Sequence, residues 1–508
     1  WFFNDDKYLN LKAKIRSEEN ETDNADLFAG NAFGGDDVTK VNAKMIREQI
    51  NPVLKYALKD PFYDTRAAAL IALGKTGMPE SLADLKTLMD DEHKQVRESS
   101  FLAMGILGNK EAIPTLIAVM NDTPEARKWV DQTNGIDTRT RAFAALGIGL
   151  IGARENDLSD TQAVSALVEM MKAKENEKQR DLQITPIVAL GIMKATEAVP
   201  ALIDFFNDKS NQSWSRAYAA TSLAKIGNPA ALPHLTKGLK DKQNAVVQSC
   251  AMALGVIAKP EDKDAVDGLQ KLVKSGADLG AKNFAIMSLA EIGGEENRNL
   301  LARMTKKGNI FERSYSALGM GVYMYQNPTD PSKGEICEDL HKFLKAEKNP
   351  DIRGANAIAL GLMSYDTAGA DILEALKDGG QASLRSHLCI ALGLMRYTAA
   401  TPEIRRTVSD KGDIDLRRNA SIALGLMGDK DAVKVLQKEI EASENSLAVH
   451  GAVTQGLGFI GDRSAVPTLI KFLKERDKFQ DSTRAFAAVA LGLLGDKDIV
   501  PELITMLG

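Results

Sequence analysis

Histidines and carboxylates are the residues in this sequence that could carry out chemistry, but their spacing builds no recognisable site. Five histidines are present: His93, His234, His341, His387 and His450. None is followed by glutamate, and no His-Glu-x-x-His, Gly-x-Ser-x-Gly or phosphate-binding Gly-rich loop occurs. With 69 acidic residues, chance pairs of carboxylates carry no information. The sequence therefore predicts no catalytic residue, no bound cofactor and no metal site.

A recurring basic position is the next candidate, because a row of arginines could bind phosphates. Aspartates such as Asp64, Asp351 and Asp481 stand two to four residues before several of its members and would neutralise such a row. The sequence thus favours a structural ladder, in which each arginine bonds an acid or a helix-end carbonyl of the adjacent unit. The predicted ladder residues are Arg66, Arg97, Arg139, Arg216, Arg353, Arg385, Arg417 and Arg484.

Each of these basic residues stands eight positions before the last residue of a repeated triplet. The triplet consists of a small residue, then Leu or Met, and usually Gly. The interval between copies is mostly about 29 to 35 residues, which is typical of helical-pair repeats. A strictly small residue at a helical position indicates that two helix backbones approach closely there. The copies begin at Ala72, Ala103, Ala145, Ala189, Ser222, Ala253, Ser288, Ala317, Ala359, Ala391, Ala423, Gly456 and Ala490.

Proline marks where the other helix of each unit begins. Pro114, Pro200, Pro233, Pro402, Pro467 and Pro501 each stand nine residues after a triplet. Proline is favoured in the first turn of a helix, and apolar residues follow it at helical spacing. Each unit is therefore predicted to be a helical hairpin whose second helix carries the triplet. Pro186 falls inside one such second helix, which is expected to start late or to kink.

The combined pattern resembles HEAT repeats of the short bacterial kind, including those of phycobilisome lyases. The clearest copy runs from Asp481 through Arg484 and Gly495-Asp496 to Pro501. This resemblance implies an all-α fold, an α-solenoid or superhelix of about thirteen HEAT-type helical-hairpin repeats spanning residues 43–508. Residues 1–42 are predicted to form an N-terminal capping helix and an acidic loop. The segment from Trp1 to Leu11 resembles the lead-in of planctomycete-type exported HEAT-repeat proteins of unknown function, and this resemblance implies an exported or cell-envelope location.

Composition argues against several partners. Net charge is −5, from 64 basic and 69 acidic side chains, so the chain as a whole has no electrostatic reason to bind nucleic acid. No apolar run reaches the length of a membrane span. Cys250, Cys337 and Cys389 fit no zinc motif, and Cys250 and Cys389 are expected in the core.

A partner-binding surface is expected on the second helices and in the lengthened repeats. The candidate residues combine aromatic and arginine side chains, which protein interfaces favour: Trp129, Arg141, Tyr218, Phe284, Arg313, His387 and Phe486. The alternative for the aromatic ones is that they complete the core between repeats. Insertions between residues 121–137, 153–160, 172–180 and 326–334 are expected to be surface loops.

The sequence therefore predicts a non-catalytic scaffold or adaptor that binds partner proteins through the solenoid groove and the inserted loops. One alternative, implied by the resemblance, is a bilin-lyase-like or chaperone-like accessory protein acting on a bound protein or pigment. A weaker alternative is a nucleic-acid-binding HEAT protein. The deoxyhypusine hydroxylases, which are HEAT enzymes, hold two irons with His-Glu pairs that this sequence lacks. Stacked repeats leave apolar ends, so assembly with further chains through exposed solenoid ends is also expected.

Overall fold

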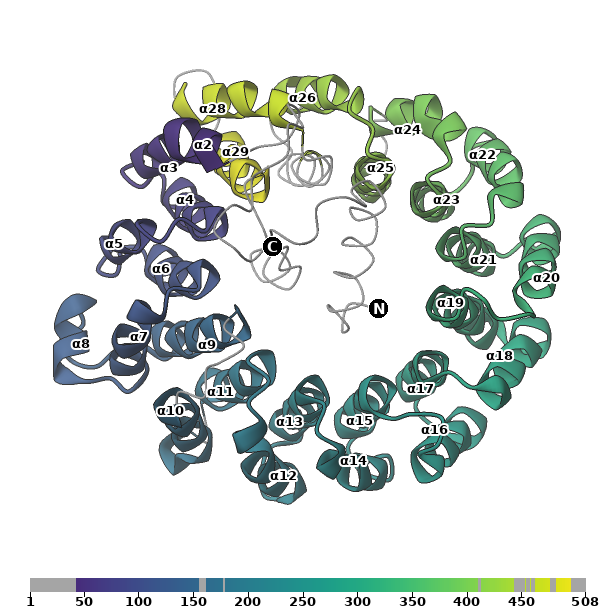
Figure 1. The fold of residues 1–508 in the computed structure, drawn as a ribbon, viewed down its shortest axis with the longest axis horizontal. Coiled ribbons are helices and arrows are strands. Elements are labelled where there is room, and N and C mark those ends of the chain that lie inside the picture. The colour runs from purple at the N-terminus through teal and green to yellow at the C-terminus, as the bar shows by residue number, and fades with distance from the viewer. Residues whose placement is uncertain are drawn as a thin grey trace.

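The helices of this protein form two concentric layers around a ring. The computed structural model describes residues 43–154, 161–176, 179–409, 413–442, 453, 457, 462–475 and 481–494. Within these ranges the helices alternate between the outer and the inner layer, and successive pairs follow the chain around the ring (Figure 1). No strand occurs among these residues. The prediction of an all-α solenoid is confirmed.

The outer layer holds the helices that open each repeat. Helix α2 (Ala43–Met45) and a π-helical turn (Ile46–Ile50) lead into its first member. Its members are α3 (Asn51–Ala57), α5 (Ser81–Lys86), α7 (Ile113–Met120), α10 (Thr161–Lys172), α12 (Val199–Asn207), α14 (Leu232–Gly238), α16 (Lys263–Ser275), α18 (Glu295–Lys307), α20 (Lys333–Ala346), α22 (Gly369–Lys377), α24 (Thr401–Val408), α26 (Ala432–Ala442) and α28 (Val466–Lys474).

The inner layer holds the helices that carry the small-residue triplet. Each packs on the outer helix of its own repeat and on the inner helices that neighbour it among the described residues. Its members are α4 (Tyr63–Thr76), α6 (Lys94–Leu107), α9 (Thr138–Arg154), α11 (Arg180–Ile192), α13 (Ser213–Ile226), α15 (Asn244–Ile257), α17 (Leu279–Ile292), α19 (Ile310–Gln326), α21 (Pro350–Leu362), α23 (Ala382–Met395), α25 (Ile414–Met427) and α29 (Asp481–Leu494).

The ends of the helices follow from proline and glycine. Pro114, Pro200 and Pro467 each lie in the first turn of an outer helix, where a missing N–H costs no hydrogen bond. Inner helices α4 and α6 end at Gly77 and Gly108, whose φ angles of 65° and 78° are left-handed. Glycine adopts that conformation without a Cβ clash, so the chain can turn sharply back to the outer layer.

Inner helices approach one another so closely that the triplet needs small residues. A Cβ on Gly361 would lie 2.7 Å from the carbonyl oxygen of Ala391, and one on Gly393 would lie 2.8 Å from the Cα of Ala423. The last residue of one triplet thus meets the first residue of the next. The middle leucine, for example Leu360, is fully buried against the outer layer.

Two repeats use a triplet that lies two residues further along than the sequence pattern indicated. In α9 the contact with the preceding helix is made by Gly147, and Gly149 meets Ala189 of the next helix. In α19 the equivalent residues are Gly319 and Gly321. The triplets that contact the neighbouring helices are therefore Gly147-Ile148-Gly149 and Gly319-Met320-Gly321. In these two helices the arginine position and the aromatic position also lie two residues later than the sequence pattern indicated.

The last described inner helix packs directly on the first. Helix α29 contacts α4 as extensively as other neighbouring inner helices contact each other, and α28 contacts α3 (Figure 1). A Cβ on Gly492 would lie 2.7 Å from the Cα of Ala72, so this junction repeats the internal ones. We call this junction the seam. The expectation that the solenoid presents exposed ends for further chains is wrong for these helices, because the curvature brings them together.

Other expectations had mixed outcomes. Helix α11 begins at Arg180 and runs through Pro186, so it does not start late. All three cysteines are buried, and burial raises the pKa of Cys389 to about 12. The insertion after α7 folds into helix α8 (Pro124–Trp129) rather than a plain loop. The predicted capping helix and acidic loop of residues 1–42 lie outside the described residues.

Candidate functional site

In several repeats an arginine of the row makes two kinds of bond, one within its own repeat and one to the next. In α13 the Nε of Arg216 donates to the carbonyl of Phe206 at the end of its own outer helix, at 2.8 Å, and its Nη2 lies 2.7 Å from Asp241 of the following repeat. Arg417 does the same with Val408 at 2.8 Å and Glu439 at 2.5 Å. Arg66 lies 2.8 Å from Asp91. Because both guanidinium edges are used, these side chains have little left to offer a phosphate.

The two-residue shift in α9 and α19 changes which arginines make this contact. Arg141 donates from Nε to the carbonyl of Met120 at 2.9 Å, and Arg313 donates to that of Thr305 at 3.3 Å while pairing with Glu347 at 2.6 Å. Both were predicted to bind a partner, but here they hold the outer helices. Arg139, which the sequence pattern put in the row, is instead about half exposed.

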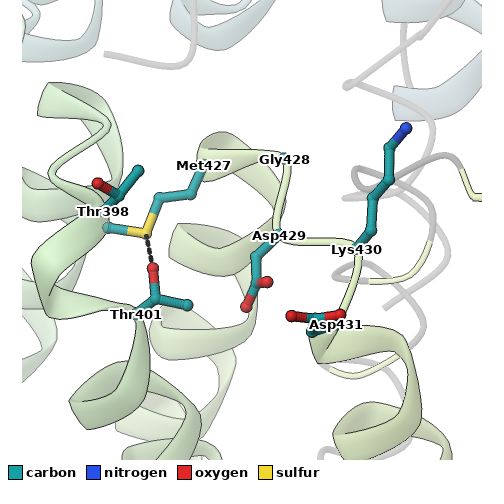
Figure 2. A pocket seen from close by; sticks show the side chains of 7 residues that line it. All are labelled: Thr398, Thr401, Met427, Gly428, Asp429, Lys430 and Asp431. Carbon is teal, nitrogen blue, oxygen red and sulfur yellow. Dashed lines mark hydrogen bonds between the residues drawn. The ribbon is translucent and has the colours of Figure 1, made fainter.

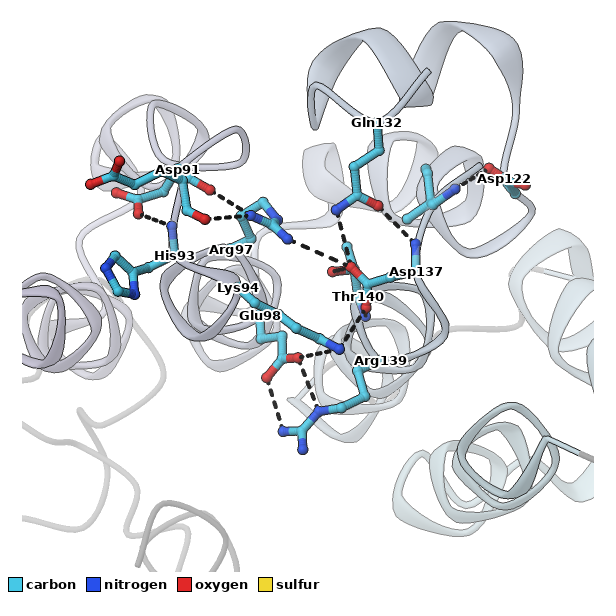
Figure 3. Close-up of polar contacts among 12 residues, drawn as sticks. Asp91, His93, Lys94, Arg97, Glu98, Asp122, Gln132, Asp137, Arg139 and Thr140 are labelled. Atoms are coloured by element: carbon cyan, nitrogen blue, oxygen red, sulfur yellow. Dashed lines mark hydrogen bonds and ion pairs between the residues drawn. The ribbon is translucent and has the colours of Figure 1, made fainter. Parts of the chain in front are cut away.

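A denser polar network joins α6 to α9 (Figure 3). Arg139 binds Glu98 of the preceding inner helix at 2.9 Å, and Arg97 lies 3.8 Å from Asp137. Burial raises the pKa of Glu98 above its usual value despite the arginine. Burial also acts to raise the pKa of Asp137, but hydrogen bonds from Thr140, Gln132 and Lys94 outweigh it and hold that pKa well below its usual range. Glu98 and Asp137 thus each have a cationic partner across the junction between α6 and α9.

The remaining ladder arginines, Arg353 and Arg385, are half-buried at the same helical position. Arg484 is 2% exposed and pairs with Asp60 and Asp481. Asp60 corresponds to Asp241, since each also accepts the backbone N–H two residues later. The ladder therefore continues across the seam.

The inner helices expose an apolar face to the centre of the ring. Successive residues of a helix are 100° apart, so positions two before and two after the buried leucine lie on the opposite face. In α15 these positions are Met252, which is half-buried, and Val256, which is 42% exposed, on either side of Leu254 at 0%. The same positions from α11 to α25 define a surface that we call the inner wall. Its members are Val188, Ile192, Thr221, Lys225, Met252, Val256, Met287, Glu291, Leu318, Val322, Ile358, Leu362, Ile390, Leu394, Ile422 and Leu426. Val256 is exposed, Val322 and Leu362 are buried, and the other members are half-buried.

Aromatic side chains lie one turn before the wall positions on several inner helices, and Phe486 holds the same place on α29, beyond the inner wall. Tyr218 is 39% exposed, while Phe284, His387 and Phe486 are half-buried. When positions are counted from Gly149 and Gly321, the residues six before them are Phe143 and Tyr315 rather than Arg141 and Arg313. Phe143, Phe284 and Tyr315 also pack against the core, so they serve the core as well as the surface.

Trp129 is separated from these residues. It ends helix α8, which projects from the outer side of the ring, and is 41% exposed (Figure 1). The ring therefore brings Tyr218, Phe284, His387 and Phe486 to one surface and leaves Trp129 on another. The inner wall itself was missed in the sequence, although its signal was present as an aliphatic residue on either side of most triplets.

One pocket among the described residues is lined mainly by polar and charged side chains. The pocket in Figure 2 lies where α25 turns towards α26 and is lined by Thr398, Thr401, Met427, Gly428, Asp429, Lys430 and Asp431. Both of its aspartates pair with Arg405. Among the described residues no three His, Cys, Asp or Glu side chains are grouped as metal ligands would be. Burial lowers the pKa of His387, whose ring packs against Gly354.

The insertion after α19 is organised by Asp330. This carboxylate accepts bonds from the hydroxyl of Tyr323 at 3.0 Å, from Arg298 at 3.1 Å and from the N–H of Ser332 at 2.9 Å. Burial acts to raise its pKa, but these bonds outweigh burial and lower the pKa to about 2. The loop is thereby fixed to α18 and α19.

This pKa predicts how the loop contributes to stability at different pH. A lowered folded-state pKa gives stability that is complete above the unfolded value of about 3.9 and is lost as pH falls towards about 2. We expect Asp330→Asn to lower the melting temperature at pH 7 and the gap to the unaltered chain to shrink between pH 4 and pH 2. Asp431→Asn is the control, because its carboxylate is 86% exposed. A gap of the same size at pH 7 and pH 2 would contradict the assignment.

No helix among the described residues has the length and apolarity needed to cross a membrane. The chain matches no curated protein sequence. Among solved structures it is similar to human deoxyhypusine hydroxylase (19% identity, 53% of this chain and 98% of that one, TM-score 0.27). It is also similar to the CpcE–CpcF complex of phycocyanin lyase from Nostoc sp. PCC7120 (19% identity, 52% and 93%, TM-score 0.32). The third is Kap121p (12% identity, 87% and 54%, TM-score 0.38).

These structural likenesses are too distant to indicate a function. The sequence profile described as HEAT repeats is more informative, because it matches residues 50–133, 175–255, 213–290 and 369–452. Together these segments cover more than half of the 508 residues. The matched repeats are the helical pairs that build the ring, and the chain belongs to the HEAT-repeat family.

Proposed function

We propose that this protein is a non-catalytic scaffold or adaptor that holds an apolar segment of a partner protein against its inner wall. The observation that carries the proposal is the composition of that surface. From α11 to α25 only Thr221, Lys225 and Glu291 interrupt its aliphatic and methionine side chains. Most of these side chains are half-buried, so a row of partly exposed apolar groups remains for a partner to cover. Apolar surface of this kind is typical of an interaction site, and methionine suits surfaces that adapt to different segments.

The chemistry of the wall also defines the partner. An amphipathic helix or an extended segment with large apolar side chains fits it, because each buried apolar side chain contributes about 1.5–3 kcal/mol. Aromatic neighbours such as Tyr218 and Phe284 would serve as anchors along one border. Nucleic acid is disfavoured, since Lys225 is the one basic member of the wall. The lengthened repeats remain a proposed second contact area, with Trp129 of α8 as its exposed aromatic residue.

A photo-crosslinking residue placed in the wall tests this directly. Benzoylphenylalanine at Ile390, which is half-buried on α23, should crosslink to a defined protein in the native cell. The same residue at exposed Lys271 on outer helix α16 is the matched control and should not crosslink to that protein. Capture of the same proteins at both sites would contradict binding at the wall.

The captured partner then allows affinity to be measured. Met287→Asp with Ile390→Asp places two charges on half-buried wall positions, and the dissociation constant should rise by about 100-fold or more, since removing two apolar contacts costs several kcal/mol. Lys271→Asp, on the outer layer, should leave the constant unchanged. Unaltered binding by the double wall variant, with its helical signal intact, would refute the proposal.

A further inference from the structure

The seam differs from every other junction between described neighbouring repeats in one physical respect. Elsewhere the repeats that touch are also successive in the chain, so their surfaces are held together by a connecting segment. At the seam, α29 and α4 touch although more than 400 residues separate Asp481 from Thr65, whose Oγ1 lies 3.5 Å from the Asp481 carbonyl oxygen. Separating these two helices therefore requires no repeat to unfold.

The polar contacts of the seam are of the same kind as those of the internal junctions. The Nε of Arg216 and of Arg417 each donates to a carbonyl of its own outer helix. The Nε of Arg484 is buried and has no hydrogen-bond partner among the described residues, and the same holds for the Nε of Arg97 and Arg353 at internal positions. The other two nitrogens of Arg484 reach Asp60 and Asp481. The seam is therefore distinguished from the internal junctions by its missing chain connection and not by its polar contacts.

The closed ring also raises a geometric problem for the function proposed above. A partner segment that lies between two folded domains cannot reach the inner wall by threading through the ring. It can reach the wall if two neighbouring inner helices part, and α4 and α29 are the pair that can part with every repeat intact. This step rests on the proposed function.

We propose that the seam between α4 and α29 is a separable joint, which opens while the repeats stay folded and admits an internal segment of the partner protein to the inner wall. The ring is thus able to close around a continuous chain. The partner class follows from this geometry: a loop or an interdomain stretch with apolar side chains is accepted as readily as a free terminus.

Thiol labelling of a matched pair of alanines tests the opening without any partner. Ala72 at the seam and Ala103 at the α4–α6 junction are both 0% exposed, and each faces the glycine of a neighbouring triplet. Ala72→Cys and Ala103→Cys are incubated with iodoacetamide, and peptide-level mass spectrometry follows each thiol beside the buried native cysteines. We expect Ala72→Cys to react at least about 100-fold faster, since its exposure needs the joint alone to open.

Either of two labelling results would overturn the joint. Equal slow rates would mean that the seam separates only with global unfolding. Reaction of Ala72→Cys as fast as an exposed thiol at Asp351→Cys would mean that the ring is not closed at all. Neither result bears on whether the inner wall binds a partner.

Locking the seam tests the access route. Thr65→Cys with Asp481→Cys places two thiols across the seam, and oxidation should join them. With benzoylphenylalanine at Ile390 in the same chain, crosslinking to an internal partner segment should be lost on oxidation and return on reduction. Crosslinking that persists in the oxidised ring would show that the partner reaches the wall by another route. Absence of crosslinking in the reduced, unlocked chain would count against the proposed function instead. The labelling rates of Ala72→Cys and Ala103→Cys would still show whether the seam opens.

Discussion

Replacing Arg484 with alanine should open the ring. This side chain is 2% exposed and bonds Asp60, whose side chain is 1% exposed, across the seam. Removing the arginine leaves a buried carboxylate without its cation, which typically costs about 3–5 kcal/mol. Because no chain connection holds α29 against α4, the seam can escape this cost by separating. Small-angle X-ray scattering should then show a larger radius of gyration and a longer maximum dimension, with the helical content of the repeats preserved.

Arg417→Ala is the matched control for this experiment. Arg417 makes the corresponding contacts inside the array, to Val408 and to Glu439 at 2.5 Å. Its loss should lower the melting temperature but leave the radius of gyration unchanged, since the chain connects the two repeats that it joins. If both variants retain the compact dimensions of the unaltered chain, Arg484 is not what keeps the ring closed.

Much of this fold could be predicted from the sequence because the repeat is a local signal. Pro114 and Pro467 begin outer helices, Gly77 and Gly108 end inner ones, and the small residues of the triplets lie where backbones meet. Each of these assignments depends on a residue's own backbone preference or on contacts with an adjacent repeat. Such information is contained in a window of a few tens of residues.

The register of α9 and α19 could not be read with the same certainty. Both helices contain two overlapping small-residue patterns, Ala145-Leu146-Gly147 followed by Gly149, and Ala317-Leu318-Gly319 followed by Gly321. A helix can present either pair to its neighbours, and the choice is made by which packing fits the adjacent helices. Because the sequence pattern was counted from the first of the two overlapping triplets, Arg141 and Arg313 were assigned to the binding surface instead of the ladder.

Ring closure depends on a property that no single repeat contains. The curvature of a solenoid is the sum of small rotations between successive repeats. Whether α29 meets α4 therefore depends on every junction between them, and a small change at each would produce an open superhelix. One residue in the sequence is consistent with closure. Asp60 stands before the first inner helix, at the position where a repeat following Arg484 would supply its acidic partner.

Gly105 and Gly334 should respond to leucine in opposite directions. A Cβ on Gly105 in α6 would lie 2.6 Å from the Cα of Gly147 in α9, and two backbones cannot both shift without breaking their other contacts. Gly105→Leu should therefore lower the free energy of unfolding by about 3 kcal/mol, near the top of the range for overpacked cores. A Cβ on Gly334 in α20 would have nothing within 4 Å, so leucine there should raise stability by about 0.5–1 kcal/mol through better helix propensity.

Urea denaturation followed by circular dichroism measures both changes on the same scale. The comparison separates close packing from any general intolerance of leucine in these helices, since both glycines are helical and differ in what surrounds them. Equal effects of the two substitutions would mean that the inner helices are not held at backbone contact. Closure of the ring depends on that contact, because wider spacing between α6 and α9 would change the curvature that brings α29 to α4.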